Sequence, residues 1–248
     1  MSKNFELMQD AQIGLDIAGI AQLKAEPRTA KRNVHLHWQE GLAREESLKL
    51  IQSLFLSRGE ESPRVIVFAG MDSGNGCSWI CAHAAETLAS QRLGNICLVD
   101  ANLRSPSLPE LFGVSNHYGL TDSLSKSGSI RDFAKVVRSD NLWLLSCGSL
   151  AATSAGLLNS ETMKLRVAEL REEFDYVLID SPPLNTYSDG LALAHLTDGL
   201  VLVLEANATR REAAAKVTEN LRAAQIKILG AVLNKRTFPI PEPLYNLL

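Results

Sequence analysis

The chain has no strong excess of charge of either sign. Its 248 residues hold 25 Lys and Arg against 28 Asp and Glu, a formal net charge of -3, which indicates neither a nucleic-acid partner nor a basic membrane-binding face. Long apolar runs are missing too: stretches such as residues 200–204 are far shorter than the roughly 20 residues of a membrane-spanning helix. Residues 1–10 do not resemble a secretory signal. We therefore expect a cytoplasmic protein without a nucleic-acid partner.

Cysteine is scarce, with four in the chain at positions 77, 81, 97 and 147. That number is too small for a disulfide framework and suits reduced thiols in a reducing compartment. The composition, 46% hydrophobic and 21% charged, is typical of a folded globular protein. At about 150 residues per domain, the length predicts one large domain, or one domain with an extension.

The hydrophobic pattern divides the chain into three parts. Residues 1–38 show no sustained period, which predicts a loosely ordered N-terminal extension. Residues 39–236 contain the periodic segments of an α/β domain. Residues 237–248 form a Pro-rich tail that is expected to be extended.

Short apolar runs alternate with helical periods throughout the predicted domain. The runs lie at 65–69, 95–99, 142–146, 176–179, 200–204 and 228–233. They are continuous rather than alternating, as strands covered on both faces are. Helical spacing occurs at 41–56, 163–174 and 214–224. The pattern predicts a doubly wound α/β fold, a mostly parallel sheet with helices on both faces, whose ligand site lies at the carboxyl ends of the strands.

The first predicted strand runs into a glycine-rich segment at residues 70–78, here called the glycine loop. A glycine turn followed by a helix directs backbone N–H groups toward an anion. The full phosphate-loop motif requires glycine where Met71 stands and lysine where Cys77 stands, although Gly76 and Ser78 match it. The bare motif is therefore incomplete, and a simple strand-to-helix connection remains an alternative.

Two further strand ends carry carboxylates. Residues 100–106 read Asp-Ala-Asn-Leu-Arg-Ser-Pro, with Leu-Phe-Gly at 111–113, and residues 180–183 read Asp-Ser-Pro-Pro. Together with the glycine loop, these motifs resemble the bacterial tyrosine autokinases of capsule and exopolysaccharide biosynthesis, relatives of the MinD and ParA ATPases. The resemblance covers roughly residues 41–236 and implies a P-loop NTPase-like fold.

The resemblance also implies a nucleotide site with residue roles. The nucleotide-binding positions would be Gly74, Gly76, Cys77 (degenerate), Ser78, Arg104 and Asn234, the last beside the base. Catalysis would involve Asp100, Asn102 (degenerate) and Asp180, and the metal ligands would be Ser78, Asp100 and Asp180, for magnesium bound with nucleotide. Taken singly, Asp and Asn residues that follow strands also serve simply to bond loop amides.

Compared with the family, this site has lost a cation and a base through two replacements. Cys77 replaces the family's lysine, whose charge is worth up to roughly 4 kcal/mol at about 4 Å from a phosphate oxygen, and a thiol at a helix N-terminus is expected to gain thiolate character. Asn102 replaces an aspartate, and an amide is no base at neutral pH. Asp72 adds another acid to the loop. We therefore expect ATP and Mg²⁺ to bind weakly or not at all.

Two family features outside the pocket are also altered. In the segment through which relatives assemble into rings, Lys49 and Gln52 replace arginines, so ring assembly is in doubt, and a solvated amphipathic helix is the alternative. The tail holds one tyrosine, Tyr245, where active relatives carry a cluster.

The sequence thus favours a degenerate, kinase-like P-loop protein, a pseudokinase, of exopolysaccharide or capsule export. It would act as a regulatory or structural partner of a membrane polysaccharide copolymerase or of an active kinase, in the cytoplasm or at the inner face of the plasma membrane, with a homo-oligomer as another arrangement. One alternative is an active ATP-dependent tyrosine autokinase with Asp100 as base. The other is a MinD- or ParA-like positioning ATPase, which needs a lysine where Asp72 stands.

Overall fold

The computed structural model describes residues 42–56, 62–149 and 156–235. They belong to one compact unit of the chain, residues 34–248. The predicted N-terminal extension and the tail with Tyr245 lie outside the described residues.

The strands are β1 Val65–Gly70, β2 Ile96–Asp100, β3 Lys135–Val136, β4 Leu142–Leu145, β5 Tyr176–Ser181, β6 Gly199–Glu205 and β7 Ile228–Asn234. The α-helices are α2 Leu42–Ile51, α3 Cys77–Ser90, α4 Leu108–Phe112, α5 Leu120–Ser125, α6 Ile130–Phe133, α7 Glu161–Glu173, α8 Asp189–Ala194 and α9 Arg211–Ala223. A π-helical turn, η1 Gln52–Leu56, continues α2, and a 3₁₀ turn, η3 Leu157–Asn159, precedes α7.

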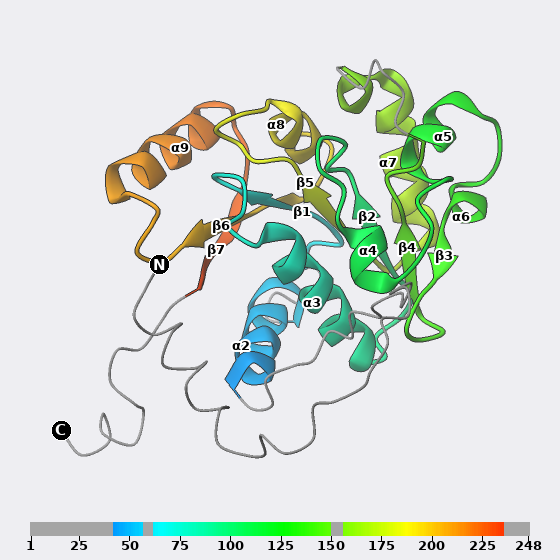
Figure 1. The fold of residues 1–248 in the computed structure, drawn as a ribbon, viewed down its shortest axis with the longest axis horizontal. Coiled ribbons are helices and arrows are strands. Elements are labelled where there is room, and N and C mark those ends of the chain that lie inside the picture. The colour runs from blue at the N-terminus through cyan, green and yellow to red at the C-terminus, as the bar shows by residue number, and fades with distance from the viewer. Residues whose placement is uncertain (1–41, 57–61, 150–155, 236–248) are drawn as a thin grey trace, which may run out of the picture. The chain divides into compact units, whose positions relative to one another are not determined.

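In the described part of the chain the strands form a seven-stranded sheet in the order β3-β4-β2-β5-β1-β6-β7 (Figure 1). Neighbours from β4 to β7 are parallel, and β3 pairs antiparallel with β4. This arrangement confirms the predicted mostly parallel α/β fold. All six predicted strands are present, and the short β3 is an addition that the sequence pattern did not indicate.

Both faces of the sheet are covered by helices, which explains why its strands read as continuous apolar runs. On β1, Val65 and Val67 pack in one hydrophobic cluster with residues of α7, α8 and α9. Ile66 and Phe68 point the other way, into a cluster with residues of α2 and α3. Figure 1 shows these helices on opposite sides of the strands. The sheet is thus fixed from both sides, and its carboxyl edge stays free for the connecting loops.

The amino edge of the sheet is held by a half-buried network around Asp198. Its carboxylate accepts hydrogen bonds from the backbone N–H groups of Arg64 and Val65 at 2.7 and 2.8 Å. The Arg171 guanidinium donates to both oxygens, at 3.0 and 2.8 Å. Burial raises the pKa of Asp198, but Arg171 and the two amides lower it further, so that the net pKa is below its usual value. Asp198 therefore has a structural role.

Candidate functional site

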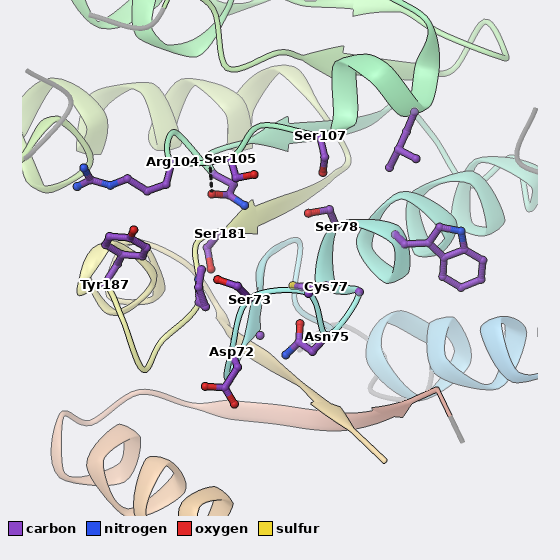
Figure 2. Close-up of a pocket in the computed structure, with 17 residues that line it drawn as sticks. Asp72, Ser73, Asn75, Cys77, Ser78, Arg104, Ser105, Ser107, Ser181 and Tyr187 are labelled. Atoms are coloured by element: carbon purple, nitrogen blue, oxygen red, sulfur yellow. Dashed lines mark hydrogen bonds between the residues drawn. The ribbon is translucent and has the colours of Figure 1, made fainter. Parts of the chain in front are cut away.

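A pocket of about 420 Å³ lies at the carboxyl edge of the sheet. The glycine loop, the segment after β2 and the segment after β5 surround it, as Figure 2 shows. Its polar lining includes Ser73, Ser78, Asn102, Ser105, Ser107, Ser181 and Tyr187. Of the lining residues in the described ranges, Asp72 and Arg104 alone carry a formal charge. The structure thus brings most of the predicted site residues to one hydroxyl-rich pocket.

The glycine loop is held from inside by a buried side chain. Gly74 and Gly76 have φ values of +81° and +84°, which favour glycine. Between them, Asn75 is 3% exposed and donates a hydrogen bond from Nδ2 to the Val203 carbonyl at 2.8 Å. A Cβ added to Gly70 would lie 2.4 Å from Asn75 Oδ1. The sequence analysis missed Asn75, because its partner is 128 positions away.

The end of β7 holds the same loop from outside. Asn234 Nδ2 donates to the Asn75 carbonyl at 2.8 Å, so this predicted base-side residue contacts the loop. Lys235 Nζ donates to the Gly74 carbonyl at 2.7 Å and pairs with Glu205 at 3.0 Å. Neither side chain lines the pocket. Lys235 is a cation beside the loop to which the sequence analysis gave no role.

Cys77 is the first residue of α3 and lies on the pocket floor, 9% exposed. Burial, reinforced by the neighbouring Asp180 carboxylate, raises the pKa of its thiol well above the usual value. The expectation of thiolate character is therefore wrong: at this position desolvation outweighs the effect of the helix N-terminus. At neutral pH Cys77 is therefore an uncharged thiol.

Asp100 and Asp180 lie side by side at the ends of β2 and β5, and both are fully buried. Asp100 accepts the N–H groups of Asn102 and Leu108, each at 3.2 Å. Burial, with the charge of Asp180, raises the pKa of Asp100 well above its usual value. Asp100 therefore bonds loop amides, the role that the sequence analysis gave as the alternative to catalysis for an aspartate after a strand.

Asp180 is different, because neither of its oxygens has a hydrogen-bond partner of ordinary geometry within the described residues. Burial raises the pKa of Asp180 to about 7, although the Ser78 hydroxyl and the Cys77 thiol beside it act in the opposite direction. Near neutral pH the group thus exchanges its proton easily. A buried carboxyl without partners is costly unless something compensates it, so Asp180 indicates a cation site.

The carboxylates suit a magnesium ion. Mg²⁺ is usually held by one or two carboxylates and keeps several waters, and Asp180, Asp100 and Ser78 offer such a set. No group of three or more His, Cys, Asp or Glu side chains in the described ranges could hold a metal alone. Waters or phosphate oxygens would therefore complete the shell, and the ion would neutralise charge in the pocket.

Little formal positive charge faces this pocket. Arg104, its single formal cation among the described lining residues, lies 3.5 Å from the Asp189 carboxylate and 4.9 Å over the Tyr187 ring. Asn102 Oδ1 accepts the Ser105 N–H at 3.2 Å. Sequence reasoning missed Tyr187 and Asp189, which lie on a turn and a six-residue helix too short for a periodic signal. The positive charge that phosphates need is already paired.

The segment in which Lys49 and Gln52 replace the family's arginines lies on α2 and the turn after it. Lys49 Nζ lies 3.0 Å from Glu45 Oε1 and 3.0 Å from Glu46 Oε1. These hydrogen bonds raise the pKa of Lys49. All three side chains and Gln52 are exposed, so Lys49 is paired with acids of its own helix.

None of the helices in the described ranges has the length and apolar character to cross a membrane.

The fold and the pocket define a P-loop NTPase type of protein. Its marks are the glycine loop between β1 and α3 and the paired carboxylates at the ends of β2 and β5. A family model described as ParA, the NUBPL iron-transfer P-loop NTPases, matches residues 62–243. The chain therefore belongs to the ParA family of P-loop NTPases.

Its similar relatives include bacterial tyrosine-protein kinases. Tyrosine-protein kinase YwqD of Bacillus subtilis is 34% identical over 161 residues, 65% of this chain and 68% of YwqD. Tyrosine-protein kinase CpsD of Streptococcus agalactiae serotype III is 26% identical over 192 residues, 77% of this chain and 82% of CpsD. The solved VpsO kinase domain is 26% identical with a TM-score of 0.70, covering 79% of this chain and 98% of that domain.

Proposed function

We propose that this chain is a kinase-like P-loop protein of exopolysaccharide or capsule export that acts as a regulatory or structural partner, with little phosphotransfer of its own. The observation that carries the proposal is Cys77: the position of the phosphate-binding lysine holds a buried thiol whose pKa is raised. The partner would be a membrane polysaccharide copolymerase or an active kinase of the same system.

Charge at the pocket supports this proposal. A lysine about 4 Å from a phosphate oxygen is worth up to roughly 4 kcal/mol at an effective dielectric near 20, about a thousandfold in affinity. In this chain Cys77 contributes nothing, and Arg104 is paired with Asp189. Nucleotide binding in such a pocket is weak.

The residues that could hold magnesium favour one competing function, an active tyrosine kinase. Asp100, Asp180 and Ser78 are retained together, and Asp180 keeps both oxygens unpaired within the described residues. A kinase needs these groups for metal, but also a second cation and a base at the phosphoryl group. Asn102, an amide bonded to Ser105, supplies neither. The competing function therefore rests on the metal ligands alone.

Calorimetric titration with ATP and Mg²⁺ tests the proposal on the full chain and two variants. Cys77→Lys should bind MgATP at least about a hundredfold more tightly than wild type. Cys77→Ser is the matched control, which removes the thiol without adding charge, and should bind as weakly as wild type. Tight magnesium-dependent binding by wild type, with phosphate on Tyr245 by mass spectrometry, would establish the kinase instead.

A second measurement addresses the partner role. Co-expression of this chain with an active kinase of the same system should change the phosphotyrosine content of that kinase, equally for wild type and for Cys77→Ser. An unchanged phosphotyrosine level and no co-purification would remove the support for a partner of this kind.

A further inference from the structure

Asn234, the last residue of β7, and Lys235, which follows it, donate hydrogen bonds to successive carbonyls of the glycine loop. Asn234 Nδ2 donates to the Asn75 carbonyl at 2.8 Å, and Lys235 Nζ donates to the Gly74 carbonyl at 2.7 Å. Glu205, at the end of β6, holds the Lys235 ammonium at 3.0 Å. Two neighbouring peptide units of the loop are thus fixed from the outside by one short segment.

Fixing a carbonyl also fixes the amide of the same peptide unit. The described chain has no cis peptide bonds, and in a planar trans peptide the C=O and the N–H point in opposite directions. With the carbonyls of Gly74 and Asn75 directed toward the β7 end, the N–H groups of Asn75 and Gly76 are directed away from it. Two successive N–H groups on one side of a loop form a nest that binds anions.

Two observations support this orientation. Within the described residues the structure gives the N–H groups of Asn75 and Gly76 no acceptor. The contact is also close: a Cβ added to Gly76 would lie 2.3 Å from Asn234 Nδ2. The loop and the β7 end therefore fit each other only with glycine at position 76, and the two amides remain available to a ligand.

We propose that Asn234 and Lys235 are positioning residues that hold the Asn75 and Gly76 amides in place for a phosphoryl oxyanion. The inference rests on the proposed function in one respect, that the pocket is a weakened phosphate site. It assigns the remaining anion affinity to an oriented backbone rather than to a cation inside the pocket.

A purely structural role of Lys235 predicts that its loss lowers stability, whereas an orienting role predicts that its loss weakens anion binding. The Lys235 side chain is 48% exposed, so its loss should change stability little. Its loss should however free the Gly74 peptide and misorient one amide. Arginine at 235 keeps a cation for Glu205 and a donor for the loop carbonyl, and is expected to restore binding.

The test uses the ¹⁵N-labelled full chain with sodium pyrophosphate as probe, followed by NMR. In wild type, pyrophosphate should shift the Asn75 and Gly76 amide signals. Lys235→Met should bind at least about tenfold more weakly, and Asn234→Ala similarly, while Lys235→Arg stays within about threefold of wild type. Lys216→Met is the matched control, because it removes one lysine charge from α9 and should bind like wild type.

Three outcomes would overturn the proposal: no shift of either amide in wild type, unchanged binding by Lys235→Met, or an equal loss in Lys216→Met, which would indicate bulk charge. Signals of core residues verify that each variant is folded, and Glu205→Gln, which frees the lysine without removing it, gives a second variant expected to weaken binding. Failure of the proposed function looks different: tight MgATP binding by wild type would refute it while leaving the amide shifts and their dependence on Lys235 intact.

Discussion

At the scale of single residues, the chemistry of the pocket depends on groups whose protonation the fold controls. Asp180 keeps its proton up to about pH 7 in the folded protein, whereas an unfolded aspartate ionises near about pH 4. The folded state therefore binds more protons between these values. Stability from this group is present at low pH and is lost as the pH rises through about 7.

Asp180→Asn tests this linkage, because an amide cannot ionise. The melting temperature of the variant relative to wild type should be higher at pH 8 than at pH 5, by about 2 °C or more. Differential scanning calorimetry at both pH values measures it. Asp72→Asn, at an exposed acid on the loop rim, should show no such difference between the two pH values. A relative melting temperature of Asp180→Asn that is independent of pH would show that the carboxyl is ionised throughout.

Cys77 leads to a second prediction at this scale. Because burial keeps its thiol protonated and only the thiolate reacts, iodoacetamide at neutral pH should modify Cys77 at least about a hundredfold more slowly in the native chain than in urea. All four cysteines are buried and free, so peptide mass spectrometry should show the same protection for the other three. Rapid alkylation of Cys77 alone in the native chain would restore the original expectation of a thiolate.

At the scale of elements, the glycine loop is shaped by packing as much as by its glycines. The side chain of Asn75 lies against Gly70, where an added Cβ would meet Asn75 Oδ1 at 2.4 Å, Nδ2 at 2.6 Å and Cγ at 2.9 Å. Every one of these atoms belongs to the same side chain. Removing that side chain should therefore make room for a larger residue at position 70.

The Gly70→Ala and Asn75→Ala substitutions form a double-mutant cycle for this packing. Gly70→Ala should destabilise the wild-type chain by about 1–3 kcal/mol through overpacking. Asn75→Ala should cost about 0.5–1.5 kcal/mol, because it removes the Asn75 donor from the buried Val203 carbonyl and leaves that oxygen with the Met71 N–H alone, at 3.2 Å. The double variant should cost less than the sum by at least about 1 kcal/mol, as measured by urea denaturation. Additive costs would show that the loop relaxes around position 70 on its own.

The elements that the sequence predicted are those with a periodic pattern of sufficient length. The predicted strands were recognisable as apolar runs, and all of them except β7 are largely buried on both faces. The helices α2, α7 and α9 were recognisable because their apolar spacing persists over ten or more residues. β3, with two residues, and α4, α5, α6 and α8, with four to six, are too short to show a period.

The site was predicted where the chemistry is local and missed where it is not. Asp100, Ser78 and Asp180 follow strands or begin a helix, and their positions could be read from the order of elements. Lys235 lies 161 positions from its partner Gly74, and nothing in the neighbouring residues marks it. The predicted direction of the pKa shift at Cys77 was also wrong: the pKa is raised by burial, and the depth of burial is set by tertiary packing that the local sequence does not show.

At the scale of the whole molecule, the proposed loss of phosphotransfer involves two separate places. Cys77 lies at the start of α3, where the phosphate-binding cation is missing, and Asn102 follows β2, where the second carboxylate is missing. The proposed metal ligands Asp100 and Asp180 are paired in register at the carboxyl edge of the sheet. A cation binds and stabilises the phosphates, whereas a carboxylate positions metal and accepts a proton. Restoring one without the other should therefore give little turnover.

The combined variant Cys77→Lys with Asn102→Asp should accordingly hydrolyse ATP in the presence of Mg²⁺ at least about tenfold faster than either single variant. An aspartate at 102 can still accept the Ser105 N–H that Asn102 now binds, so the turn after β2 should keep its shape. A phosphate-release assay measures the rates, and addition of Asp180→Asn should abolish the gained activity because it removes the unpaired metal ligand. Turnover by wild type at the rate of the double variant would mean that the oriented backbone and the bound metal suffice without either group.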